Sequence, residues 1–228
     1  MLVPGFTQTA SSWARTAEVV RVSCDVRSLD VPAPGTFATT AHAIGSAGGR
    51  AIYVGYSMGG RLCLRLAVDR PDIVRALMLV STSPGIADPA ERAARVEADA
   101  LLAESVERDG VHTFLADWLA QPMFAGVPAD APGLTDRRKL TPQFLAACLR
   151  QLGAGAMEPM WNEVSTLTMP VMLVAGSRDA KYTAIAQRML ERMHARVSLV
   201  QLDGGHALPL EQPAVLGGLI TAFAADHG

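Results

Sequence analysis

The sequence of 228 residues contains little cysteine, few aromatic residues and no long apolar run. Its three cysteines, Cys24, Cys63 and Cys148, lie far apart and have neither metal-ligand nor disulfide-framework spacing. Such cysteine usage is typical of a reduced compartment, so we expect a cytoplasmic protein with no bound metal ion. No apolar stretch approaches the roughly 18 residues of a membrane span, so we expect no membrane partner.

An excess of one charge is also missing. The 20 Lys and Arg residues nearly balance the 22 Asp and Glu residues, which gives a formal net charge of −2. A protein that binds nucleic acid mainly through its phosphates is usually basic, so this balance argues against a nucleic-acid partner. Residues 1–6 lack a basic region and a long apolar region, so we expect no secretory signal.

The sequence does contain enough apolar material for a large core, because 50% of its residues are hydrophobic and 18% are charged. The length predicts a single domain, residues 1–228, with an insertion. Short β-rich runs alternate with turns and helical runs, which predicts an α/β fold with a mostly parallel sheet and helices on both faces. The expected strands are Met1–Val3, Val19–Cys24, Arg50–Val54, Ala76–Val80, Val171–Ala175 and Val197–Leu202.

Helices are expected between most of these strands, at Thr39–Ser46, Met58–Asp69, Thr183–Met193 and Ala214–Ala225. The stretch from about residue 84 to residue 168 differs, because it has helical patterns and no convincing strand. Its expected helices run from Asp88 to about Gly110, over Val111–Ala120, from Thr141 onward and around Met157–Thr166. An insertion at the carboxyl edge of a parallel sheet lies over the crevice where ligands bind, so we interpret 84–168 as a helical cap.

The most specific motif is Gly55-Tyr56-Ser57-Met58-Gly59, which follows a predicted strand and precedes a predicted helix. In that context a serine sits on a strained turn that presents its hydroxyl above the sheet, and the flanking glycines let strand and helix approach closely. We therefore predict that Ser57 is a nucleophile or a base. The alternative is a glycine-rich turn without chemistry.

A serine hydroxyl needs a base that takes its proton. His206 follows the last predicted strand in a loop, whereas the other four histidines lie in predicted helices or at the C-terminus. We predict His206 as the base, against the alternative of a surface histidine that caps the next helix. Asp179 follows another strand end and is predicted to orient the imidazole, whereas Asp203 is close enough in sequence to shape the local turn instead. The order Ser57, Asp179, His206 matches the α/β-hydrolase arrangement.

Two backbone amides are candidates for an oxyanion hole. Met58 begins the helix after Ser57, where the N–H groups of the first turn are free to stabilise a developing negative charge. Phe6 lies in the loop after the first predicted strand, which is where this fold places a second donor.

Seven short segments carry a closer likeness, at residues 4–7, 55–61, 83–86, 91–95, 114–124, 176–182 and 204–206. Together they resemble the 2-succinyl-6-hydroxy-2,4-cyclohexadiene-1-carboxylate synthases (MenH) of menaquinone biosynthesis, an α/β-hydrolase-fold family. Segment 114–124 is the more specific part, because many unrelated hydrolases share the triad. Two pieces depart from the family pattern: Pro4 replaces a usual His, and residues 25–35 lack the His of an Asp-x-Pro-Gly-His-Gly motif.

The resemblance implies an enzyme that eliminates pyruvate from a cyclohexene intermediate with several carboxylates, in which Ser, freed by His, removes a proton from carbon. Arg61 lies one helical turn after Ser57 and can bind a carboxylate through two hydrogen bonds. Arg95 matches the family's second substrate arginine, and Trp118 and Tyr56 match its pocket positions. The alternatives are a structural ion pair for Arg61, a solvated arginine at Arg95 and simple packing for Trp118.

We therefore expect a carbon–oxygen lyase with a small carboxylate substrate and no cofactor. The residues alone leave open a carboxylesterase or thioesterase that works through an acyl-enzyme. They also leave open a binding protein that retains the fold as a ligand receptor. The sequence does not reveal the oligomeric state.

Overall fold

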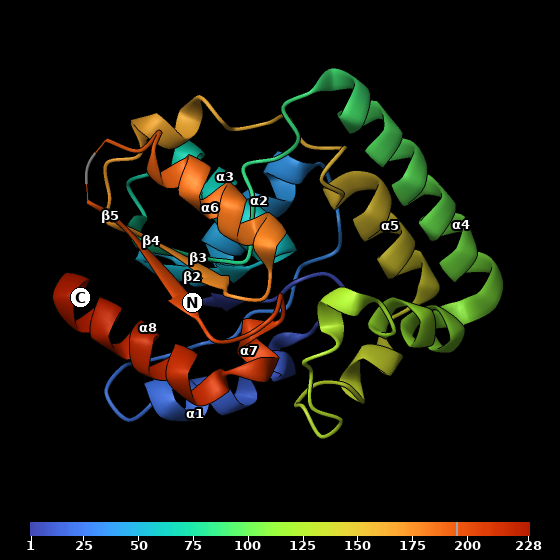
Figure 1. Ribbon diagram of the computed structural model, residues 1–228, viewed down its shortest axis with the longest axis horizontal. Helices are drawn as coiled ribbons and strands as arrows, with labels where there is room; N and C mark the ends of the chain where they lie inside the picture. Colours follow the sequence, from blue (N-terminus) through green and yellow to red (C-terminus); the bar gives the residue numbers. More distant parts are fainter. Residues whose placement is uncertain (195) are drawn as a thin grey trace.

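The computed structural model describes residues 1–194 and 196–228. Within these ranges the centre of the molecule is a parallel sheet of five strands in the order β1-β2-β3-β4-β5 (Figure 1). The strands are β1 (Leu2–Val3), β2 (Ala51–Tyr56), β3 (Val74–Val80), β4 (Val171–Gly176) and β5 (Val197–Leu202). The predicted α/β fold with a parallel sheet is confirmed.

Helices cover both faces of the sheet (Figure 1). Strand order follows chain order, so right-handed crossovers place the connecting helices α2, α3 and α6 on one face. From β1 the chain also passes through α1 to Ser28, which bridges Leu2 on the other side of β1. This connection leads away from β2, whereas the later connections follow the strand order. Helix α1 therefore packs with α8 on the face of the sheet opposite α2, α3 and α6. The bounds are α1 (Ala14–Val20), α2 (Phe37–Gly48), α3 (Met58–Asp69), α6 (Ala180–Leu190), α7 (Leu208–Glu211) and α8 (Pro213–His227).

This reversal of direction places a crevice at the carboxyl ends of β1 and β2, and such a switch point is where α/β sheets bind ligands. The two core clusters meet at the sheet, because alternate side chains of each strand point to opposite faces. In β3, Leu77 and Leu79 join the cluster under α2 and α3, whereas Met78 and Val80 join the cluster under α1 and α8. Burial on both faces explains the nearly unbroken apolar strands.

Between β3 and β4 the structure describes every residue, and this stretch contains helices and loops but no strand. We call residues 84–168 the helical segment. Its α-helices, α4 (Pro89–Leu119) and α5 (Pro142–Leu152), pack against each other around a core cluster of their own (Figure 1). Asp88 caps α4 by accepting a hydrogen bond from the Glu91 amide at 2.8 Å, and α4 is interrupted at Gly110, where φ is 80°. Three 3-10 helices complete the segment, at Pro122–Phe124, Asp136–Lys139 and Glu163–Thr166.

Two predicted elements are wrong. Val19–Cys24 is not a strand, because its first two residues complete α1 and a turn follows. Val20 is buried in the cluster beneath α8, so packing of a helical face outweighs the β propensity of the valines. Met157–Thr166 is not an α-helix. The Met160 amide and the Trp161 indole N–H instead bond to the carbonyls of Pro84 and Gly85, at 2.7 and 2.9 Å, which ties this stretch to the start of the helical segment.

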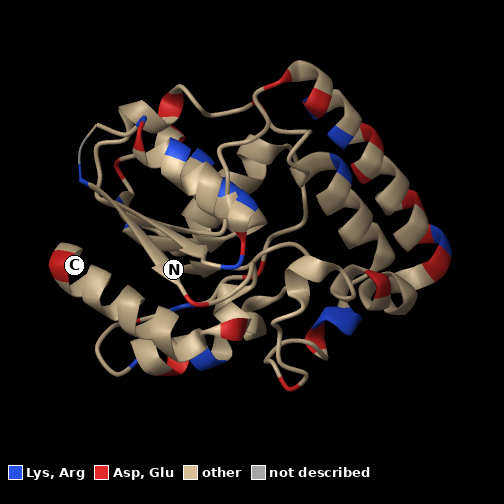
Figure 2. Ribbon diagram, in the orientation of Figure 1, with Lys and Arg blue, Asp and Glu red and all other residues tan. Residues whose placement is uncertain are grey.

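Basic and acidic positions are interspersed along α4 (Figure 2). None of the helices in the described ranges combines the length and the apolar character needed to cross a bilayer.

Candidate active site

The turn between β2 and α3 holds Ser57 in a strained conformation, with φ 52° and ψ −112°. A left-handed backbone is unfavourable for serine and persists only where its surroundings enforce it. Here the Ser57 amide donates to the Val80 carbonyl at 2.9 Å, and the Thr82 hydroxyl donates to the Ser57 carbonyl at 2.7 Å. At Gly59 any side chain would meet the carbonyls of Val3 and Pro4, so only glycine lets α3 begin this close to β1.

His206 connects Ser57 to Asp179. Its Nδ1 lies 2.7 Å from Asp179 Oδ2, and its Nε2 lies 3.2 Å from Ser57 Oγ. A carboxylate only accepts hydrogen bonds, so Nδ1 carries the ring proton and Nε2 is free to accept the proton of the Ser57 hydroxyl. The imidazole is 2% exposed, and Asp179 Oδ1 also accepts from the Tyr182 amide at 3.2 Å.

The competing carboxylate, Asp203, lies elsewhere. It is exposed and forms an ion pair with Arg178. Of the two aspartates weighed from the sequence, the structure therefore brings only Asp179 to the imidazole.

A cavity of about 520 Å³ opens beside these side chains, at the carboxyl ends of the strands and under the helical segment. All nine residues predicted for catalysis, oxyanion stabilisation and substrate binding line it, namely Phe6, Tyr56, Ser57, Met58, Arg61, Arg95, Trp118, Asp179 and His206. The amide of Met58 is the first of α3 and has no intrahelical partner. Phe6 lies on the loop after β1, next to Thr7, which has a left-handed φ of 65°.

Arg61 is a buried cation that pairs with no carboxylate of residues 1–194 and 196–228. It is 9% exposed, and Nη1 donates to the Leu152 carbonyl at 2.8 Å and approaches Met157 Sδ at 3.5 Å. Burial lowers the pKa of this guanidinium to about 10. Arg61 lines the cavity, and a guanidinium can bind an anion through two hydrogen bonds.

Arg95 is not simply a solvated helix residue. Its Nε donates to Asp99 Oδ1 at 2.8 Å, and the Asp99 side chain is 3% exposed. Burial raises the pKa of Asp99, and Arg95 opposes this shift. The other oxygen of Asp99 is buried and has no hydrogen-bond partner among the residues that the structure describes. Asp99 is not among the residues predicted from the sequence, although its spacing of four residues from Arg95 indicates a pair on one helix face.

The aromatic side of the cavity is tightly packed. Trp118 stands edge-on to Phe6, with ring centres 5.0 Å apart, and its indole N–H is buried with no partner within the described ranges. The rings of Tyr56 and Tyr182 lie 5.4 and 4.5 Å from the His206 ring, and burial raises the pKa of both phenols. Tyr182 is a wall residue to which the sequence reasoning gave no role.

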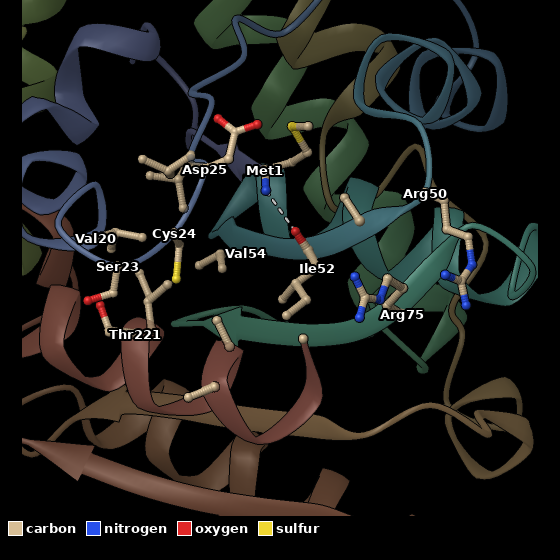
Figure 3. A pocket seen from close by; sticks show the side chains of 17 residues that line it. Met1, Val20, Ser23, Cys24, Asp25, Arg50, Ile52, Val54, Arg75 and Thr221 are labelled. Atoms are coloured by element: carbon tan, nitrogen blue, oxygen red, sulfur yellow. Dashed lines mark hydrogen bonds between the residues drawn. The ribbon is translucent and has the colours of Figure 1, made fainter.

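A second cavity, of about 490 Å³, lies at the amino ends of the strands and contains none of the predicted residues. Figure 3 shows Arg50 and Arg75 on one side of it and Ser23, Cys24 and Thr221 on the other. The Met1 amino group donates to the Ile52 carbonyl there at 2.7 Å. In the described ranges no group of three or more His, Cys, Asp or Glu residues is placed to hold a metal ion.

Comparison with known proteins gives the same picture of the fold. A putative 2-succinyl-6-hydroxy-2,4-cyclohexadiene-1-carboxylate synthase of Bacillus subtilis is 34% identical over 176 residues, which cover 75% of this chain and 64% of that protein. The corresponding synthase of Klebsiella pneumoniae (strain ATCC 700721 / MGH 78578) is 32% identical over 72% of this chain and 64% of its own length. Each alignment thus spans somewhat less than two thirds of the relative.

Among solved structures, MenH from S. aureus superposes with a TM-score of 0.86 and 24% identity, over 99% of this chain and 93% of that one. The resemblance to the synthases seen in the short motifs is therefore confirmed as a resemblance. The sequence pattern of the alpha/beta hydrolase family extends over residues 1–217. Since that match covers nearly all of the strands and helices described above, the chain belongs to the alpha/beta hydrolase family, a family of enzymes.

Proposed function

We propose that this protein is a carbon–oxygen lyase that eliminates pyruvate from a cyclohexene bearing several carboxylates, giving 2-succinyl-6-hydroxy-2,4-cyclohexadiene-1-carboxylate. One observation carries the proposal. The buried guanidinium of Arg61, which pairs with no carboxylate in the described part of the chain, shares a cavity with a Ser57–His206–Asp179 hydrogen-bonded chain. An enzyme for neutral esters has no need to bury an unpaired cation, whose desolvation is costly.

The triad acts as a proton relay in this proposal. Nε2 of His206 takes the Ser57 proton, and Ser57 Oγ takes a proton from the ring carbon of the substrate. The electron pair of that C–H bond forms the new ring double bond, and the C–O bond to the pyruvyl group breaks. The leaving group departs as the enolate of pyruvate, and it takes up the proton that His206 holds, which restores the free imidazole. The products are the cyclohexadiene and pyruvate, and no acyl-enzyme forms. Asp179 keeps the imidazole in the tautomer that this transfer requires.

The rest of the cavity binds and stabilises. The amides of Phe6 and Met58 stabilise the enolate-like oxygen that develops when the proton leaves. Arg61 and Arg95 bind carboxylates, while Trp118 and Tyr56 contact the ring. The helical segment acts as a cap over the cavity within a single domain, and the proposed chemistry uses no metal or organic cofactor.

The curated relatives named as this synthase support the substrate class. The chain aligns with 64% of the length of each of these relatives. A carboxylesterase or thioesterase is the weaker second candidate, because the same triad can form an acyl-enzyme.

The test compares two substrates. Purified protein is incubated with the polycarboxylate cyclohexene, and pyruvate is measured by coupled NADH oxidation with lactate dehydrogenase. In parallel, hydrolysis of a short p-nitrophenyl ester is followed. The proposal predicts rapid pyruvate release and slow ester cleavage. The reverse result establishes the esterase, and turnover of neither substrate favours a binding protein.

A further inference from the structure

One carboxylate next to the triad has no part in the chemistry described above. Glu211 ends the short helix α7, and its side chain is 2% exposed. A carboxylate removed from water to this extent is unfavourable unless it accepts hydrogen bonds. Its hydrogen-bond partners therefore indicate what it does.

Both oxygens of Glu211 bind the loop that carries the imidazole. Oε2 accepts from the Gly205 amide at 2.7 Å, and Oε1 accepts from the Ala207 amide at 2.9 Å. These amides belong to the residues immediately before and after His206. One rigid carboxylate thus fixes the backbone on both sides of the imidazole, which must meet Asp179 on one edge and Ser57 on the other.

The surroundings of Glu211 are shaped to admit it. A side chain at Gly126, on the helical segment, would collide with the carboxylate, and a Cβ at Gly205 would lie 2.9 Å from Oε1. The compensating cation is Arg178, whose Nη2 lies 3.5 Å from Oε2 and whose chain neighbour is Asp179. The carboxylate therefore joins the loops after β4 and β5, on which two triad residues are carried.

We propose that Glu211 is a positioning residue for the triad. It holds residues 205–207 so that the imidazole stays aligned with Ser57 Oγ while the proton moves. This inference rests on the proposed function in one respect, namely that His206 is the base for Ser57. Loss of Glu211 should lower kcat and the reactivity of Ser57, because the imidazole is no longer held in place. It should leave KM unchanged, because Glu211 does not line the cavity.

The test uses a fluorophosphonate, which reports on the triad independently of the natural substrate. Ser57 Oγ attacks phosphorus, fluoride leaves, and the imidazole takes the serine proton. Glu211→Gln keeps one acceptor oxygen and turns an NH2 group toward the second backbone amide. We expect labelling of Ser57 and kcat to fall about a hundredfold, the usual consequence of a small misplacement of a catalytic group. Glu211→Asp keeps the charge but is too short to reach both amides, so it is also slow.

The matched control is Gln212→Ala. Gln212 is the next residue and also bonds this loop, donating to the Asp203 carbonyl at 2.7 Å, yet it contacts neither amide beside His206. The Gln212→Ala variant should label at nearly the wild-type rate. If Glu211→Gln labels at the wild-type rate while Ser57→Ala does not label, the inference about Glu211 is wrong and the triad stands. If the wild-type protein does not label, the proposed function fails and the inference falls with it.

Amide hydrogen exchange in the wild type gives a second measurement, which does not depend on a variant that folds. Gly205 and Ala207 lie in a loop, and their amides bond to a side chain rather than to a strand or helix. The proposal predicts that both exchange slowly. Exchange of both at the rate of exposed loop amides overturns it.

Discussion

The two walls of the active-site cavity satisfy their polar groups to different degrees. On the wall formed by strand ends, Ser57, His206 and Asp179 bond to one another, and backbone contacts hold their loops. On the wall formed by the helical segment, one oxygen of Asp99 and the indole N–H of Trp118 are buried without a partner among the described residues. Buried polar groups are normally paired, and both of these residues line the cavity. We call the first wall the catalytic wall and the second the recognition wall. Under the proposed function the catalytic wall is preassembled, and substrate completes the recognition wall.

Removal of the reactive atom of the catalytic wall should reduce activity more than any other change considered below. Ser57→Ala removes the oxygen that takes the substrate proton in the proposed reaction, and it should lower kcat by several powers of ten, with little change in folding. The measurement is pyruvate release under saturating substrate. Ser165→Ala, which removes a hydroxyl bonded to the Asn162 carbonyl on the helical segment, is the control. Activity of Ser57→Ala within tenfold of the wild type would show that Ser57 has been misassigned.

The next effect separates recognition from chemistry. Arg61→Ala should lower kcat/KM for the carboxylate substrate by about tenfold to a hundredfold, the value of one or two hydrogen bonds to a charged group. For a neutral p-nitrophenyl ester the same change should have little effect. Arg65→Ala is the matched control, because Arg65 lies one turn further along α3 and pairs with Asp69. Equal losses on both substrates would mark Arg61 as a purely structural arginine.

A smaller effect tests how closely the catalytic wall is packed. Gly59→Ala introduces a Cβ against the carbonyls of Val3 and Pro4, so α3 must shift away from β1. We expect the free energy of unfolding to fall by about 1–3 kcal/mol. Gly218→Ala in α8 is the control, since a Cβ there meets no atom within 4 Å and should stabilise the helix by about 0.5–1 kcal/mol. Urea denaturation measures both, and similar values for the two variants would contradict the close approach.

The smallest expected effect concerns pH and the recognition wall. Burial raises the pKa of Asp99, so acidification neutralises Asp99 before exposed carboxyl groups. Loss of this negative charge strengthens the positive field of Arg61 and Arg95, and KM for a carboxylate substrate should fall severalfold as the pH decreases. In Asp99→Asn the KM trend should disappear. A KM trend identical to that of the wild type would exclude Asp99 as its cause.

The two walls also differ in how many of their residues could be predicted from the sequence. Ser57, Asp179 and His206 each follow a strand end, and parallel strands bring those ends to one edge, so their meeting was predictable without coordinates. Arg61 was also predictable, because helical spacing alone places it one turn after Ser57. These predictions depend on local pattern and on the general geometry of parallel sheets.

The remaining features depend on contacts between distant parts of the chain. Val19–Cys24 has the composition of a strand. Its first residues are helical instead, because they pack against α8, which is formed by the last residues of the sequence. Asp99 and Glu211 look like ordinary surface acids in sequence, and only the fold shows that both are buried beside the site. Burial of a charged residue by a remote segment leaves little local signal.

In the proposed reaction, Ser57 and His206 remove a proton from carbon. The most direct test is the deuterium isotope effect on kcat/KM, with substrate deuterated at the ring carbon that loses its proton. If the proton is removed from carbon, the ratio of kcat/KM for undeuterated to deuterated substrate should be clearly above one. Released pyruvate should equal the cyclohexadiene formed, and no burst of acyl-enzyme should appear. A ratio of one together with an acyl-enzyme burst would show that the proposed reaction is wrong and would establish ester hydrolysis instead.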